Sequence, residues 1–114
     1  MTSGTAGLRP GPGAAVGGAL NGAVIAFTRG LAIDLAPKRI RVNTVIPGVV
    51  VTELWTKLVP SVENRQQVLE NSKKKLLVPE VGTPEDVAES YVYFLRADYS
   101  TGQTLVIDGG GLLA

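Results

Sequence analysis

The sequence predicts an α/β layer fold with parallel strands, and three observations support this prediction. Helical periodicity runs through residues 14–36, and a second helix start stands at Thr83. Each helix precedes a short apolar run, residues 40–46 and 103–108, of the kind that is buried on both faces of a parallel sheet. The order is helix, strand, helix, strand, and this alternation is typical of α/β layers.

Length and composition narrow the class of protein further. We expect residues 1–114 to form a single domain, because 114 residues can bury one core. The chain has no His and no Cys, which excludes His-based general bases, thiol chemistry, disulfides and ordinary zinc sites, so we expect no metal. A net charge of +1 gives no field that would attract nucleic acid or an anionic membrane surface.

The distribution of apolar residues predicts a cytoplasmic protein. The densest apolar run, residues 45–51, is interrupted by Pro47 and Gly48, so we expect no membrane-spanning helix. No charged segment followed by an apolar one opens the chain, as a signal peptide would. The lysines at 73–75 fit the solvated end of a helix.

The first helix is predicted from residues spaced three or four apart. They form one apolar stripe, and a neighbouring stripe consists of Ala and Gly, so we expect close packing on two sides. Pro37 ends the pattern. The apolar stripe is Val16, Leu20, Val24, Phe27, Leu31 and Leu35, and the small-residue stripe is Ala15, Ala19, Gly22, Ala26 and Gly30.

The remaining segments follow from turn and capping residues. Residues 1–13 suggest the stub of a strand followed by a Gly/Pro loop. Residues 49–79 are less periodic, and we expect them to form a flap over Trp55. Thr83 can cap the second helix, with Pro84 in its first position and Asp86 three residues after the cap.

Five sequence blocks resemble the short-chain dehydrogenase/reductase family in order and spacing. They are residues 28–37 (TRGLAIDLAP), 40–43 (IRVN), 47–52 (PGVVVT), 82–88 (GTPEDVA) and 101–110 (TGQTLVIDGG). The resemblance implies a partial Rossmann-like, doubly wound fold that is truncated at its N-terminal half. It also implies NAD or NADP as cofactor, although the glycine-rich turn that cradles the dinucleotide belongs to the half we expect to be missing.

The resemblance also locates the catalytic positions. The family uses a Ser and a Tyr-x-x-x-Lys motif, in which Tyr is the acid/base and Lys lowers its pKa and holds the ribose. The Tyr position falls on Gly17 and the Lys position on Asn21, while Ser3, near Thr5, lies where the substrate-orienting serine is expected. Ser3 and Asn21 are therefore the candidate catalytic residues, without the family's proton donor.

Half of a nicotinamide pocket is implied by the block that begins at residue 47. The resemblance places the carboxamide against Pro47, Gly48, the backbone of Val50, and Thr52. Alternatively, Pro47 and Gly48 only end a strand. Three nearby residues have plainer interpretations: Asn43 as a strand-to-loop hydrogen-bonding residue, Trp55 as flap core and Glu53 as a helix-start carboxylate.

Three functions remain open at this point. The first is a descendant of an NAD(P)-dependent oxidoreductase that is inactive in standard hydride transfer by itself and has a small-molecule substrate. The second is a pseudoenzyme or interaction module that forms a homo-oligomer or associates with a related full-length chain, because two strands leave a sheet edge open. The third is a cofactor-independent enzyme with a pocket under residues 49–79, using Ser3, Thr5, Asn21 or Glu53.

Overall fold

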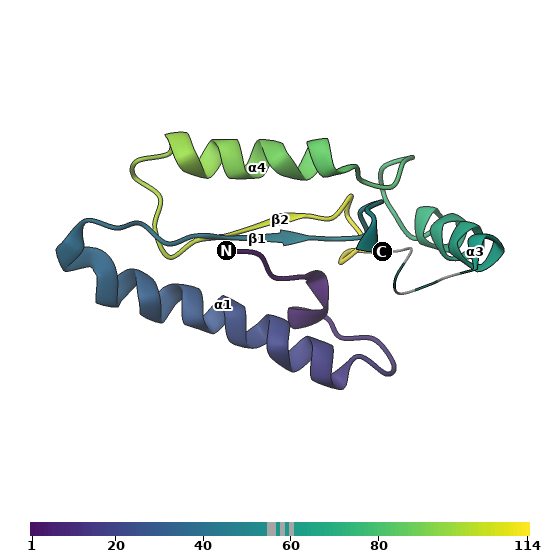
Figure 1. Cartoon of the computed structure of the whole chain (residues 1–114), viewed down its shortest axis with the longest axis horizontal. Helices are drawn as coiled ribbons and strands as arrows, with labels where there is room; N and C mark the ends of the chain where they lie inside the picture. The colour runs from purple at the N-terminus through teal and green to yellow at the C-terminus, as the bar shows by residue number, and fades with distance from the viewer. Residues whose placement is uncertain (55–56, 58, 60) are drawn as a thin grey trace.

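The computed structural model describes residues 1–54, 57, 59 and 61–114. In Figure 1, α1 and α4 lie on opposite faces of a small sheet, and α3 lies beyond one end of it. The elements in chain order are η1 (Thr5–Gly7), α1 (Ala15–Leu35), η2 (Ala36–Lys38), β1 (Thr44–Pro47), α3 (Val62–Lys73), α4 (Pro84–Arg96) and β2 (Thr104–Ile107).

The sheet is parallel throughout. β1 pairs with β2 in a register that sets Thr44 opposite Thr104. Residues 1–3, the edge segment, add a parallel bridge between Thr2 and Val45, with Val45 N donating to the carbonyl of Met1 at 3.0 Å. The predicted strand stub is therefore present. The α/β class with parallel strands is confirmed, and all three chain segments point their carboxyl ends toward the same edge.

The centre of the core is β1. Val45 and Ile46 are 1% and 0% exposed, in keeping with a strand buried on both faces. β1 begins at Thr44, later than the predicted start at residue 40, because the preceding side chains bond to the loop before β2. The amide of Asn43 donates to Ser100 O at 2.8 Å and its Oδ1 accepts from Gln103 N at 3.0 Å, which confirms the strand-to-loop role predicted for Asn43.

The predicted apolar stripe of α1 is only partly covered: Val24, Leu31 and Leu35 are half-buried, and none of its residues is fully buried. Val16, Leu20 and Phe27 are 75%, 65% and 58% exposed. The buried residues of the helix are instead Gly18, Ile25, Thr28 and Ala32, of which only Ile25 is a large apolar residue. Gly18 shows how close this packing is: a Cβ there would lie 3.0 Å from the carbonyl oxygen of Ala6, which is a tight contact, so the absence of a side chain favours the close approach of η1 and the following loop.

A buried pair of hydroxyls fixes α1 against the sheet. Thr28 and Thr44 are both fully buried and their Oγ1 atoms are hydrogen-bonded. The Thr28 hydroxyl donates to Val24 O at 2.7 Å. Because a hydroxyl has one proton, Thr44 is the donor in the pair, and both groups are satisfied.

The expectation about membrane-spanning helices needs correction. By length and composition alone, the stretch Ala15–Lys38 could cross a membrane, with a mean hydropathy of 1.4 over an 18-residue window, of which 22% is buried. The small residues of α1, such as Ala19 and Ala26, raise its hydropathy without forming a long run of large side chains. The same helix packs on η1 and β1.

The segment predicted as an irregular flap contains a helix, α3. Ser61 caps it by accepting a hydrogen bond from Asn64 N at 3.3 Å, and none of its residues is fully buried. This exposure explains why the segment lacks a clear apolar period. The predicted packing of Trp55 lies outside the described residues.

The start of α4 is as predicted. Thr83 Oγ1 accepts from Asp86 N at 3.2 Å, and the Asp86 carboxylate accepts from Thr83 N at 2.8 Å, while Pro84 stands in the first turn. This reciprocal pair satisfies backbone groups that a helix start leaves free. The hydrogen bonds from Thr83, first the backbone one and then that of the hydroxyl, hold the pKa of Asp86 below its ordinary value.

Candidate functional site

Three strand ends meet at one edge of the sheet. Ser3 ends the edge segment, and Gly48 and Asp108 directly follow β1 and β2. Gly48 N donates to Ile107 O at 2.9 Å, and a Cβ on Gly48 would lie 2.7 Å from the Asp108 Cα. Glycine is therefore what lets the two strand ends close on each other. In open parallel sheets, ligands bind in the crevice beyond such strand ends.

A cleft of about 420 Å³ lies at this edge, within the range of small-molecule sites. Loops after all three strand ends and the segment after α3 contribute to its walls, so residues far apart in the sequence share one cavity. Its lining is Thr5, Arg9, Gly11, Gly48, Val49, Ser72, Lys75, Leu76, Asp108, Gly111 and Leu112.

Asp108 shapes the wall that follows β2. Its Oδ1 accepts from Gly110 N at 2.9 Å and its Oδ2 accepts from Leu112 N at 2.8 Å. Gly109 and Gly110 adopt left-handed backbone with φ of 61° and 79°, which side chains disfavour. The carboxylate therefore holds a tight glycine turn, and both of its oxygens have backbone donors.

Two cationic side chains line the cleft, and sequence reasoning missed both. Arg9 donates from Nη1 to Leu112 O at 2.6 Å and from Nη2 to Ala114 O at 2.8 Å, which ties the loop after η1 to the end of the chain. Lys75 follows α3. Lys74 and Lys75 are exposed at the end of α3, in agreement with the predicted solvated helix end; Lys75 also lines the cleft, whereas Lys73 pairs with Glu80 at 3.2 Å.

The structure brings the predicted catalytic positions together. Ser3 is 8% exposed, and its hydroxyl donates to Asn21 O at 2.8 Å and to Asn21 Oδ1 at 3.3 Å. The Asn21 amide in turn donates to Gly17 O at 2.8 Å. A Cβ at Gly7 would lie 2.7 Å from the Asn21 carbonyl carbon, so η1 sits directly on this part of α1. The cluster consists of neutral groups that hydrogen-bond to one another.

The four predicted nicotinamide contacts have different surroundings. Gly48 lines the cleft, and Pro47 pairs with Ile107 as the last residue of β1. Val50 forms a parallel bridge with Gly82 and lines a second cavity of about 280 Å³. Thr52 is exposed. Pro47 and Gly48 thus do end a strand, and Gly48 in addition borders the cleft.

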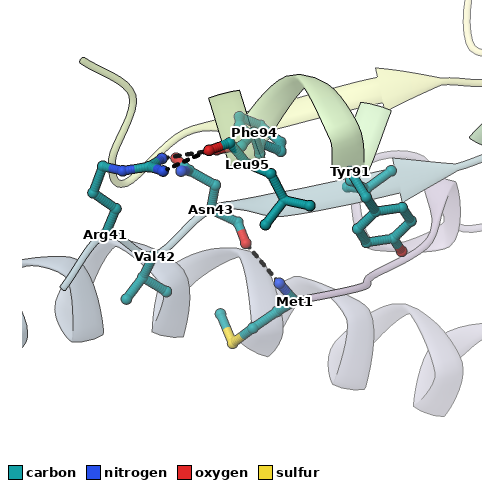
Figure 2. A pocket seen from close by; sticks show the side chains of 8 residues that line it. Met1, Arg41, Val42, Asn43, Tyr91, Phe94 and Leu95 are labelled. Carbon is teal, nitrogen blue, oxygen red and sulfur yellow. Dashed lines mark hydrogen bonds between the residues drawn. The ribbon is translucent and has the colours of Figure 1, made fainter. Parts of the chain in front are cut away.

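A third cavity, of about 470 Å³, lies on the α4 side of the edge segment (Figure 2). The Met1 amino group donates to Asn43 O at 2.6 Å, and Tyr91 Oη is 2.6 Å from Thr2 Oγ1. The Arg41 guanidinium donates to carbonyl groups around the end of α4, including that of Phe94 at 2.9 Å. Because these polar groups already have partners, we assign this cavity to packing rather than chemistry.

The fold and the cleft define a class of protein: a Rossmann-like α/β fold with its ligand crevice at the carboxyl ends of parallel strands. Residues 1–111 match a family described as enoyl-(acyl carrier protein) reductase. The chain belongs to the short-chain dehydrogenase/reductase family, as the sequence blocks predicted. The match runs through the edge segment, both strands and both packed helices.

Related proteins agree with this assignment. The chain is 40% identical over 113 residues to the short-chain dehydrogenase/reductase ATR9 of Stachybotrys chlorohalonatus, covering 99% of this chain and 43% of that protein. It is 36% identical over 104 residues to the 3-oxoacyl-[acyl-carrier-protein] reductase of Bos taurus, covering 91% and 40%.

Solved structures give the same picture. A small-chain dehydrogenase in complex with NADPH superposes with a TM-score of 0.92 at 34% identity, covering 99% of this chain and 50% of that one. The MalC reductase/Diels-Alderase of Malbranchea aurantiaca gives 0.90 at 34% identity, covering 99% and 42%. The chain therefore spans half or less of the length of these relatives, and the partial Rossmann-like fold is confirmed.

Proposed function

We propose that this chain is the C-terminal, substrate-side part of a short-chain dehydrogenase/reductase-type protein of NAD(P)-dependent oxidoreductase origin. By itself it does not carry out the family's standard hydride transfer. The observation that carries this proposal is the residue at the acid/base position, which is Gly17 and has no side chain.

What the chain lacks for standard hydride transfer is a proton donor at the acid/base position. Reduction of a carbonyl by hydride leaves negative charge on oxygen, and a positioned acid must neutralise it. Gly17 offers none, and Asn21 is neutral with its amide donating to the Gly17 carbonyl. The three tyrosines, Tyr91, Tyr93 and Tyr99, lie on α4 or just after it, on the sheet face opposite α1. Tyr91 Oη lies 2.6 Å from Thr2 Oγ1, next to Ser3 in the sequence, but it reaches the edge segment from α4 and not from α1, where the family's Tyr stands.

The residues present fit a dinucleotide only in part. Gly48 lines the cleft where the resemblance places the nicotinamide end of NAD or NADP, and Thr52 is exposed. The ribose end is different, because the amide of Asn21 replaces the family's lysine and donates to Gly17 O at 2.8 Å. When bound, the dinucleotide supplies the hydride; we expect it to bind this chain weakly.

The test measures NADH and NADPH consumption with a panel of small aldehydes and ketones. We expect no rate above the buffer background from the natural chain. Carbonyl-dependent consumption that Ser3→Ala reduces would refute the proposal. The double variant Gly17→Tyr with Asn21→Lys restores the family's Tyr and Lys at their positions, and Gly17→Ala is its control. Among the described residues nothing lies within 4 Å of a Cβ at Gly17, so the new side chain meets no obstacle at its root.

The exposed face of α1 favours a second candidate function, that of an interaction module. Val16, Leu20 and Phe27 are all more than half exposed, and large apolar patches on a surface mark interaction sites. We propose that this face and the open edge at residues 1–3 support a homo-oligomer or association with a related full-length chain. Light scattering after size exclusion tests this: a mass above 11.9 kDa that falls to that value in Leu20→Glu supports it.

The cofactor-independent enzyme and the cytoplasmic location remain predictions. The cavity beside Val50 contains the carboxylates of Glu80 and Asp86. Because Asp86 is held in the capping box with a lowered pKa, it is ionised at neutral pH and is not a ready acid. The expected residue for this role, Glu53, is exposed.

A further inference from the structure

We propose that the cleft at the strand ends binds a small amphipathic organic anion. Arg9 and Lys75 hold its carboxylate, and Val49, Leu76 and Leu112 contact its apolar body. The inference rests on the proposed function in one respect, namely that this cleft is the substrate side of the chain. It goes beyond that function in naming the chemical class of the ligand.

The two cations come from separate parts of the chain and share one cavity. Arg9 belongs to the loop after η1, and Lys75 belongs to the turn after α3, where Lys75 N donates to Ser72 O at 3.0 Å. Both residues are exposed to solvent as well as lining the cleft. That both line the same cleft, of about 420 Å³, is therefore a result of the tertiary fold.

Arg9 is held in place before any ligand arrives. Its two terminal nitrogens donate to the carbonyls of Leu112 and Ala114 at 2.6 and 2.8 Å. A guanidinium has five N–H donors, so it keeps further donors beyond these two bonds. A donor that is already ordered loses less conformational entropy when it binds an anion.

The charged groups of the cleft differ in how far they are already paired. Of its lining residues, Arg9 and Lys75 are cationic and Asp108 is acidic, and Arg9 also donates to an oxygen of the terminal residue Ala114 at 2.8 Å, which in this chain is a carboxylate. Asp108 has a backbone N–H on each oxygen, at 2.9 and 2.8 Å, so its charge is directed into the glycine turn. In the described part of the chain, no salt bridge occupies Lys75, whereas Lys73 has two acidic partners.

The other lining residues determine the rest of the ligand. Val49, Leu76 and Leu112 provide apolar surface, and Thr5 and Ser72 provide hydroxyls. The Ser72 hydroxyl donates to Val68 O at 2.8 Å, so its oxygen remains an acceptor. Bare phosphate would leave the apolar wall in contact with water, whereas a carboxylate on a hydrocarbon or aromatic body would cover it.

The experiment is a titration of the ¹⁵N-labelled full chain, without dinucleotide, followed by NMR at the amides of Gly11, Gly48 and Gly111. The probe is 3-phenylpropionate, and its neutral counterpart is 3-phenylpropanol. We expect saturable shifts for the carboxylate and binding at least about 3-fold weaker for the alcohol, the ratio an exposed charge pair supports. Inorganic phosphate should bind more weakly than the carboxylate.

Variants distinguish this site from general attraction to cations. Lys75→Gln is expected to weaken the carboxylate about 3- to 5-fold, whereas Lys74→Gln, its exposed neighbour outside the cleft, should leave affinity unchanged. Arg9→Lys keeps the charge but loses the planar donor geometry, so it should bind more weakly than the natural chain. Amide spectra of each variant show that it is folded.

Some outcomes would overturn the inference. These are equal affinity for the alcohol and the carboxylate, equal losses in Lys74→Gln and Lys75→Gln, or phosphate binding as tightly as 3-phenylpropionate. None of these involves hydride transfer, so they leave the proposed function standing. Conversely, dinucleotide-dependent turnover by the natural chain would refute the proposed function without affecting the anion titration.

Discussion

Replacing Gly48 with alanine tests how closely the ends of β1 and β2 approach. A Cβ at this position would lie 2.7 Å from Asp108 Cα and 2.8 Å from Asp108 Cβ. Carbon atoms in favourable contact are about 3.5–4.0 Å apart, so the strand ends would have to separate by roughly 1 Å. The neighbouring hydrogen bond from Gly48 N to Ile107 O, 2.9 Å long, stands in the path of that movement.

The expected loss of unfolding free energy in Gly48→Ala combines two effects. Overpacking of this kind destabilises by about 1–3 kcal/mol, and weakening the hydrogen bond adds about 1 kcal/mol. We therefore expect Gly48→Ala to lower the free energy of unfolding by about 2–4 kcal/mol, equivalent to roughly 8–16 °C in Tm for a domain of this size. Asp108 Cα belongs to the backbone, so it cannot rotate away from the new methyl group as the end of a flexible side chain could.

The assay is urea unfolding followed by far-ultraviolet circular dichroism, with Gly17→Ala as the matched control. Gly17 lies inside α1, and nothing among the described residues lies within 4 Å of a Cβ there. The control should therefore gain about 1 kcal/mol from helix propensity. A Gly48→Ala chain within about 0.5 kcal/mol of the natural one would refute the close approach of the strand ends.

Two further predictions concern stability. Thr28→Val leaves the buried Thr44 hydroxyl without its acceptor and should cost about 1–3 kcal/mol, whereas adding Thr44→Val should recover part of that loss; additive losses in the urea midpoints would contradict the pairing. Because the pKa of Asp86 is lowered in the folded chain, its contribution is present above the unfolded value of about 3.9 and is lost as pH falls through the folded pKa. Asp86→Asn should therefore be less stable than the natural chain at pH 7, and the difference in unfolding free energy should narrow as pH falls below about 4; a difference of equal size at every pH would contradict this, and Glu89→Gln is the control.

Local signals were sufficient for several parts of the fold. The capping residues Thr83 and Asp86 placed the start of α4, and the apolar run before Pro47 placed β1, because both depend on neighbours in sequence. Helix periodicity located α1 but not the residues that it buries. Large apolar residues such as Phe27 marked the predicted stripe, whereas burial follows how closely a helix can approach its neighbours, and Gly18 and Thr28 permit the closest contact.

The candidate site was likewise predicted only in part from the sequence. Motif spacing predicted that Ser3, Gly17 and Asn21 belong together, and the structure joins them through hydrogen bonds. Motif spacing could not predict Arg9 or Lys75 as cleft residues, because a cation in a loop has the same sequence signature whether it faces water or a cavity.

The sequence by itself determined the family, the α/β class, the order of α1, β1, α4 and β2, and the absence of a Tyr side chain at residue 17, because each of these depends on residue type and spacing along the chain. Only the tertiary structure decided which face of α1 is buried, that residues 1–3 pair with β1, and that Arg9, Lys75 and Asp108 border one cleft. The reason is physical: these depend on distances between segments up to a hundred residues apart, and such distances are set by close packing rather than by local preference.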